Sequence, residues 1–172
     1  MVTKTVHPWA KYRKSAGFTQ AQAADRVGVT RHMIIRLEQS LFWHPPQDSV
    51  LVKLSTLYDI ELGTFEMAYY QYVRDRREEY AKTHKDFDTI LAKREFPKLH
   101  PLVEYRSFYE LSRMGLCKAI CLHYDPISEW EMNKQRSIPD QLKEACEEMQ
   151  WSTELLEDEV SKWRRFGYAD KL

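Results

Sequence analysis

The 172-residue chain is poor in glycine and cysteine, and both shortages exclude kinds of functional site. Its 5 glycines do not form the closely spaced groups that hold phosphates or dinucleotides. The chain also lacks the ordered Ser, His and Asp motifs of hydrolases. We therefore expect a protein that is not an enzyme. The 3 cysteines, an odd number, provide no disulfide framework.

A zinc site is the one metal centre for which the residue types are present, at Cys117, Cys121, His123 and Cys146. The spacing of four puts Cys117 and Cys121 on one helical face, but His123, two residues later, points elsewhere. No Cys-x-x-Cys knuckle occurs. We expect the cysteines to be buried in a core, and we expect neither a metal nor another cofactor.

Long apolar runs are also missing from the chain. No stretch reaches the roughly 18 apolar residues of a membrane-spanning helix, and the first residues lack the apolar centre of a signal peptide. We therefore expect a cytoplasmic protein with no membrane partner. With 43% hydrophobic and 30% charged residues, the composition favours a soluble, helix-rich fold.

The net charge of zero conceals an asymmetry between the two ends of the chain. Residues 1–60 hold 8 Lys and Arg against 4 Asp and Glu, an excess of four positive charges. The other residues hold 18 against 22, an excess of four negative charges. A region that contacts phosphates has such an excess, although an excess of this size also arises by chance.

Two short helical patterns with a tight break between them lie in residues 19–40, TQAQAADRVGVTRHMIIRLEQS. Thr19 and Gln22 have the spacing of a capping box, and Thr30 is suited to cap the second helix. Gly28 permits the left-handed backbone that ends the first helix. The apolar residues at helical spacing predict the inner faces of the two helices: Ala23, Ala24 and Val27 on the first, and Ile34 and Leu37 on the second.

Residues 8–60 resemble the helix-turn-helix domain of the lambda-repressor/Cro family. The match consists of GFTQAQAADRVGVTRHMIIRLEQS and the later amphipathic segment SVLVKLSTLYDI. The resemblance covers about a third of the chain. It implies five helices, of which the third lies in the DNA major groove. The loop LFWHPPQD between the two segments departs from the family, which often has a short polar turn there.

The resemblance also assigns DNA-binding roles to individual residues. Gln20 matches the position that contacts a phosphate and braces the reading helix. Thr30 caps that helix and is placed to contact a phosphate of the DNA. Arg31 and His32 match base-reading positions, and Arg36 lies one turn further on. Arginine can donate to guanine O6 and N7, and imidazole can donate to an acceptor or stack on a base. Lys11, Arg13 and Lys14 are expected on an ordinary charged face of the first helix.

Downstream of this domain, residues 62–85 predict one long helix whose aromatic stripe is a packing surface. Two prolines in residues 94–101 mark a boundary. We thus predict an all-α protein with three parts: a lambda-repressor-like domain (1–61), a long connecting helix and linker (62–96), and a second helical, helix-turn-helix-like domain that ends in a C-terminal helix (97–172).

A repeat in the sequence motivates the second helix-turn-helix-like unit, in residues 100–150. His7-Pro8 matches His100-Pro101, and Tyr12-Arg13 matches Tyr105-Arg106 at the same offset. An insertion of five residues then aligns Gly17-Phe18 with Gly115-Leu116. In this register Lys118 opens a helix, Asp125-Pro126 break it, Ser128 caps a reading helix, and Trp130 and Lys134 belong to that helix. We therefore add Lys118, Ser128, Trp130 and Lys134 to the expected DNA-binding residues.

Acidic residues in this presumed reading helix leave its role open, because the negative charges of Glu129 and Glu131 repel the phosphates of DNA. The unit either binds DNA weakly or contacts a protein. We expect a sequence-specific, double-stranded DNA-binding transcriptional repressor of the kind found in phages and bacteria, which reads an asymmetric site with two units. The alternative is an antitoxin-type or other interaction protein whose C-terminal domain binds a protein partner or dimerises.

Overall fold

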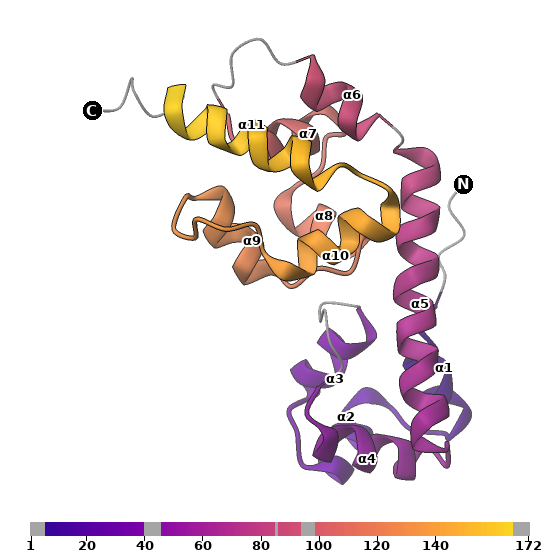
Figure 1. The fold of residues 1–172 in the computed structure, drawn as a ribbon. Helices are drawn as coiled ribbons and strands as arrows, with labels where there is room; N and C mark the ends of the chain where they lie inside the picture. The colour runs from indigo at the N-terminus through magenta and orange to yellow at the C-terminus, as the bar shows by residue number, and fades with distance from the viewer. Residues whose placement is uncertain (1–5, 40–45, 85, 94–98, 167–172) are drawn as a thin grey trace. The chain divides into compact units, whose positions relative to one another are not determined.

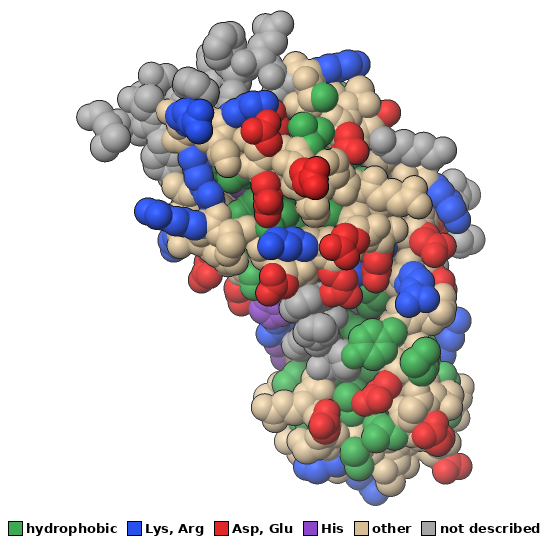
Figure 2. Space-filling model, in the orientation of Figure 1, with side chains coloured by type: hydrophobic (Ala, Val, Ile, Leu, Met, Phe, Trp, Pro, Cys, Tyr) green, Lys and Arg blue, Asp and Glu red, His purple; other side chains and the backbone are tan. Residues whose placement is uncertain are grey.

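All regular structure in the described part of the protein is helical (Figure 1). The computed structural model describes residues 6–39, 46–84, 86–93 and 99–166. These residues contain no strand, which confirms the predicted all-α class. Charged side chains of both signs are spread over the face drawn in Figure 2. The helices are α1 (Pro8–Ser15), α2 (Gln20–Val27), α3 (Arg31–Glu38), α4 (Asp48–Leu57), α5 (Leu62–Thr83), α6 (Phe87–Ala92), α7 (Pro101–Phe108), α8 (Arg113–Ala119), α9 (Tyr124–Glu131), α10 (Asp140–Met149) and α11 (Thr153–Phe166).

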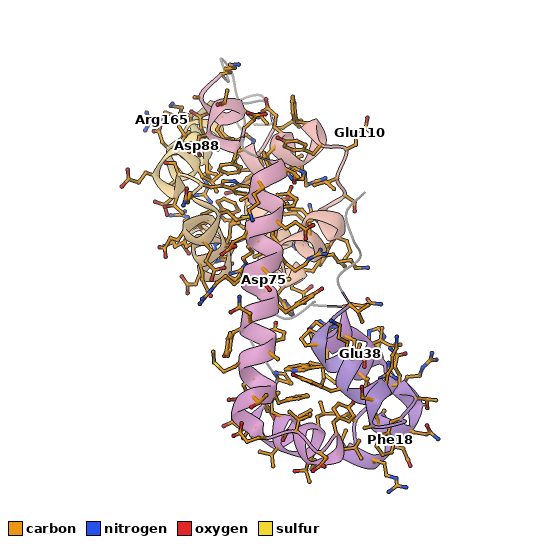
Figure 3. All side chains as sticks on the ribbon, turned by 90° about the vertical axis from the view of Figure 1, so that its right-hand side faces the viewer. Phe18, Glu38, Asp75, Asp88, Glu110 and Arg165 are labelled. Atoms are coloured by element: carbon orange, nitrogen blue, oxygen red, sulfur yellow. The ribbon has the colours of Figure 1, made fainter. Side chains whose placement is uncertain are left out.

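The chain divides into two compact units, Met1–Asp75 and Arg76–Leu172. The boundary falls inside the long helix α5, at the labelled Asp75 (Figure 3). The sequence predicted residues 62–96 as a separate connecting segment, whereas in the structure the two ends of α5 are packed into different cores. Phe65 is buried in the first unit, and Arg77 is buried in the second.

Aromatic stacking forms the core of the first unit. The indole of Trp9 on α1 stacks on Phe65 with ring centroids 4.7 Å apart, and on Tyr69 at 4.9 Å. Its Nε1 donates to the Phe65 carbonyl at 2.8 Å. The aromatic stripe of α5 is therefore a packing surface at Phe65 and Tyr69, as the sequence predicted.

The ends of α2 and α3 follow the predicted signals. The Thr19 hydroxyl accepts from the Gln22 N–H at 3.2 Å, and the Gln22 side chain accepts from the Thr19 N–H at 2.9 Å. Gly28 ends α2 with φ +76°. The Thr30 hydroxyl accepts from the Met33 N–H at 3.2 Å and caps α3. These local bonds set the turn between α2 and α3.

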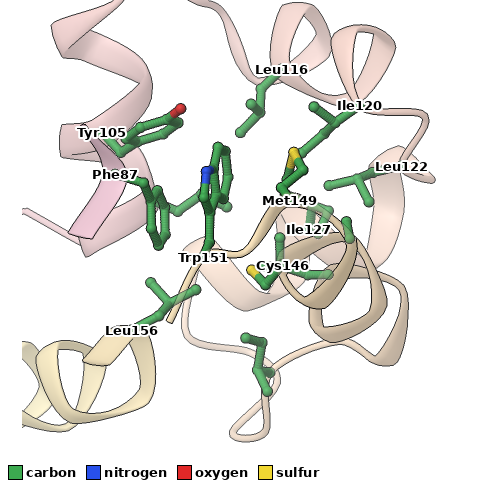
Figure 4. Close-up of a cluster of buried hydrophobic side chains, with 14 of the residues drawn as sticks. Phe87, Tyr105, Leu116, Ile120, Leu122, Ile127, Cys146, Met149, Trp151 and Leu156 are labelled. Atoms are coloured by element: carbon green, nitrogen blue, oxygen red, sulfur yellow. The ribbon is translucent and has the colours of Figure 1, made fainter. Parts of the chain in front are cut away.

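A larger core, drawn in Figure 4, holds the second unit together. Trp151 stacks on Phe87 with ring centroids 4.1 Å apart and meets Tyr105 edge-on at 5.0 Å. Arg77 enters the unit from α5, where Nε donates to the Ile120 carbonyl at 3.1 Å and Nη1 to Glu148 at 2.8 Å.

The three cysteines are buried, as the sequence predicted. Burial raises the pKa of the Cys117 and Cys146 thiols to about 12, because the thiolate would lose its hydration. No group of His, Cys, Asp and Glu arranged to hold a metal ion occurs among the described residues. Within those residues no helix is both long and apolar enough to cross a membrane.

Candidate nucleic-acid interface

Helix α3 has a buried face and an exposed face, and their separation follows from its sequence. Ile34 and Leu37 are buried against the rest of the first unit. At about 100° per residue, positions 32 and 36 lie on the opposite side of the helix, and position 31 lies on its flank. Arg31 and His32 are exposed, and Arg36 is half-buried. The three predicted base-reading residues therefore lie outside the buried face of α3.

A buried ion pair holds α3 against α1. The guanidinium of Arg13 donates from Nε to Glu38 Oε1 at 2.6 Å and from Nη2 to Oε2 at 3.0 Å. Its Nη1 donates to the Phe18 carbonyl at 2.7 Å, and both acceptor residues are labelled in Figure 3. The hydrogen bond to Glu38 raises the pKa of Arg13. With five donors in a rigid fork, arginine can satisfy both partners at once.

The burial of Arg13 corrects one expectation from the sequence, which placed this residue on an ordinary charged face with Lys11 and Lys14. Both lysines are exposed, whereas Arg13 is buried. A signal for this burial was present, because Arg13 follows the buried Trp9 by four residues and Ala10 by three. Glu38 was also missed as a functional residue, since its role depends on a partner 25 residues away.

Gln20 is the first residue of α2, and Thr30 is the residue that caps the start of α3. The Gln20 side-chain amide donates from Nε2 to Glu38 Oε2 at 2.9 Å, so Gln20 supports α3 through the same carboxylate that binds Arg13. Thr30 is exposed beside Arg31 at the start of α3. An N-terminal turn with free N–H groups attracts anions. Contact of either residue with a phosphate stays a prediction.

In the second unit, the remaining predicted residues do not have the positions that the sequence alignment gave them. Ser128 is buried inside α9 and does not cap it, because α9 begins at Tyr124. Asp125 and Pro126 lie in the first turn of α9 and break no helix. Proline is tolerated there because the first N–H groups of a helix have no intrahelical partner. The predicted break and cap at these residues are wrong.

Trp130, Lys118 and Lys134 also differ from their predicted places. Trp130 is 1% exposed, and its ring meets His100 edge-on with centroids 4.5 Å apart, so it belongs to the core. A side chain buried in this way has no surface to offer to DNA. Lys118 lies in the last turn of α8 and does not open a helix. Lys134 is exposed, but beyond the end of α9.

The aromatic loop that departs from the family pattern holds Phe42, Trp43 and His44, which lie outside the described residues. Helix α4 is the next helix after α3, and it packs against α2. The Lys53 ammonium of α4 donates to the Val27 carbonyl at 3.2 Å and thereby satisfies an acceptor at the end of α2.

Comparisons with known proteins agree with the geometry of the first unit. A family model described as helix-turn-helix matches residues 10–65. No curated protein and no solved structure matches the chain. The matched segment begins in α1, includes α2, α3 and α4, and ends in the first turn of α5. It contains both partners of the Arg13–Glu38 pair. Residues 10–65 are a helix-turn-helix domain of the lambda-repressor/Cro type.

Proposed function

We propose that this protein is a transcriptional repressor that binds double-stranded DNA sequence-specifically, with α3 as its reading helix. A helix-turn-helix domain of this type suggests a DNA-binding transcription regulator. The observation that carries the proposal is the exposure of Arg31 and His32 in the first turn of α3, outside its buried face. Repression, and an origin in a phage or bacterium, rest on analogy with the family.

The chemistry of the exposed side of α3 suits the major groove. Arg31 and Arg36 can each donate two hydrogen bonds to a guanine edge, and His32 can donate to an acceptor or stack. Gln20 and Thr30 would set the register of α3 through phosphate contacts, which position the protein without reading sequence. The ion pair between Arg13 and Glu38 keeps α3 rigid, so that little ordering entropy opposes binding.

An asymmetric site read by two units, as expected from the sequence, needs Ser128 as a cap and Trp130 as a reading residue. Both side chains are buried. We therefore assign base reading to the first unit, and the DNA that one α3 reads is then a single half-site.

Selection of bound sites from random double-stranded DNA tests the proposal with the full chain. We expect enrichment of a short motif and a steep decrease of affinity with salt, because Lys and Arg release counterions from the phosphates. An unselected pool bound as tightly as the final pool would contradict sequence-specific recognition. Transcription from a promoter that overlaps the enriched motif then separates repression from activation.

A further inference from the structure

The bracing network of the first unit occurs a second time in the chain. Arg106 donates from Nε to Glu131 Oε1 at 3.1 Å and from Nη2 to Oε2 at 3.4 Å, which are the same atom pairs that join Arg13 to Glu38. Each pair spans 25 residues. The offset from the first pair to the second, 106 minus 13 or 131 minus 38, is 93 residues in both cases.

The same offset of 93 residues relates the bonds at the helix ends. His7 Nδ1 accepts from the N–H two residues later and caps α1, and His100 Nδ1 does the same for α7. Thr19 accepts from the N–H three residues later and caps α2, and Ser112 does the same for α8. Such local bonds form only if the backbone follows the same course at the two places in the chain.

Backbone conformation repeats at this offset even where the residue type changes. Gly28 ends α2 with φ +76°, and Cys121 lies in the corresponding turn after α8 with φ +53°. Gly17 has φ +79°, and Glu110 has φ +53°. Non-glycine residues are uncommon in this left-handed region. Two such conformations at the same offset as the ion pairs are therefore independent signs of a repeated path.

Helices α5 and α11 correspond with a slightly shorter offset of 91 residues. Phe65 on α5 and Leu156 on α11 are both fully buried, 156 minus 65 residues apart. His7 meets Tyr72 edge-on with centroids 4.7 Å apart, and His100 meets Trp163 edge-on at 4.9 Å. The N-terminal histidine thus packs against the final helix of its own unit in both cases.

We infer that residues 100–166 are a second copy of the five-helix fold of residues 7–75, and that the second copy has lost the DNA-reading surface of the first. The inference rests on the proposed function of α3. The repeated contacts place α7 to α11 in correspondence with α1 to α5. The C-terminal half of α5, with α6, is an addition to the second copy.

The charge of the corresponding surface is reversed in the second copy. At an offset of 93, Asp125 replaces His32 and Glu129 replaces Arg36, and both acidic residues are exposed. Tyr124 stands in place of Arg31. Double-stranded DNA carries two phosphate charges per base pair, so exposed carboxylates on a reading helix oppose binding.

The contact of Gln20 with Glu38 is also repeated in the second copy. The counterpart of Gln20, Arg113, donates from Nε to Glu131 Oε2 at 2.5 Å and from Nη1 to the Ser128 hydroxyl at 3.0 Å. Glu131 thereby receives two guanidinium groups, from Arg106 and Arg113. This contact braces α9 in the way that the contact of Gln20 with Glu38 braces α3. Because the surface charge of α9 is reversed, one chain presents one reading helix, α3.

Two double variants of the full chain separate the roles of α3 and α9 on the selected DNA site. Arg31→Ala with Arg36→Ala removes two cations from α3 and should weaken binding at least tenfold. Asp125→Ala with Glu129→Ala should leave affinity unchanged or raise it, because the carboxylates make no favourable DNA contact. A tenfold loss in the second variant would show that α9 contacts DNA and would overturn the inference.

A gain-of-function variant tests whether α9 is presented to solvent as α3 is. In the Arg31→Ala, Arg36→Ala background, Asp125→His and Glu129→Arg place the α3 residue types on α9. We expect DNA affinity to rise about tenfold above that of a control with the same charge change, Glu147→Gln with Glu154→Arg, at exposed sites on α10 and α11.

Helical circular dichroism equal to that of the parent establishes that the converted protein is folded. A folded converted protein that binds DNA no better than its control would overturn the correspondence between α9 and α3. If the unmodified chain selects no DNA motif at all, the proposed function fails. The comparison of the converted protein with its control still decides the inference in that case, because non-specific DNA serves as the probe.

Discussion

Arg13 and Glu38 form an ion pair behind the reading helix, with side chains that are each 8% exposed and Nε 2.6 Å from Oε1. The pair joins α1 to the last residue of α3. Gln20 donates to the same carboxylate, so the first residue of α2 is held at this point too. One buried carboxylate therefore fixes the orientation of α3, whose exposed side we propose to read DNA.

Removal of the Glu38 charge should strongly destabilise the first unit. In Glu38→Gln the Arg13 guanidinium remains buried without a counter-charge, and we expect a loss of about 3–5 kcal/mol in the free energy of unfolding. Native-state hydrogen exchange of the α2 and α3 amides measures this loss. The double variant Arg13→Met, Glu38→Leu should lose less, because no unpaired charge stays buried. A single variant within 1 kcal/mol of the parent, roughly the size of an exposed pair, would contradict this account.

Replacement of Arg31 should relax specificity at one base pair of the selected motif. A bidentate contact to guanine gives about 1–3 kcal/mol of discrimination, so Arg31→Ala should lose that amount on the best site and less on sites altered at that base pair. Binding to a library of single-base variants measures the effect. Lys11→Ala on α1 is the matched control and should change all sites alike. Identical profiles for the two variants would remove Arg31 from base reading.

The stability of the first unit should decrease in mildly acidic solution because of His7. Burial lowers the pKa of His7 from 6.5 to about 3. Between these two pH values the unfolded chain binds a proton that the folded unit does not. The free energy of unfolding therefore decreases as the pH is lowered, by up to about 1.4 kcal/mol per pH unit. Urea unfolding between pH 6.5 and 5 tests this. His7→Asn retains a capping side chain without this titration, and an undiminished pH slope in it would assign the effect to other groups.

Gly28 should tolerate substitution poorly, although a side chain has room there. An added Cβ meets no atom within 4 Å, so the cost comes from the φ of +76° alone. Gly28→Ala should destabilise the first unit by about 1–2 kcal/mol, and Gly28→Asn by less, because asparagine enters the left-handed region more readily. Thermal unfolding of the two variants measures the order. Equal stability of the alanine variant and the parent would contradict it.

Truncation of Trp130 should reduce stability and leave DNA contacts intact. The side chain is 1% exposed in the core of the second unit, so Trp130→Ala should lose about 3–5 kcal/mol. Unfolding in urea measures this loss. Below the unfolding transition, the affinity of the folded variant for DNA should equal that of the parent. A folded variant with weaker DNA binding and normal stability would return Trp130 to the DNA surface.

Local signals in the sequence were sufficient to predict the helix-turn-helix of the first unit. The Thr19 capping box, Gly28 in the left-handed region and the Thr30 cap each involve residues at most four apart. Such contacts form within one turn of backbone and depend little on the rest of the fold. The inner faces of α2 and α3 followed from helical periodicity for the same reason.

The register of the second unit could not be found in this way. The sequence alignment matched Gly17-Phe18 to Gly115-Leu116, and this match required five inserted residues. In the structure Gly115 lies inside α8, and the positive φ belongs to Glu110. A non-glycine residue is held there by the packing of the whole unit, which can outweigh a local strain of about 1–3 kcal/mol.

Burial of charge was decided by tertiary contacts alone. Arg13 and Arg106 look like surface residues in the sequence. In the structure Arg13 is buried and Arg106 is half-buried, because a carboxylate 25 residues further on lies beside each of them. Trp130 becomes a core residue in the same way, when α9 turns its face toward His100. Capping and periodicity depend on residues close together in one helix and can be recognised in the sequence. Pairing across 25 residues depends on how the helices pack, and only the folded structure reveals which side chains meet.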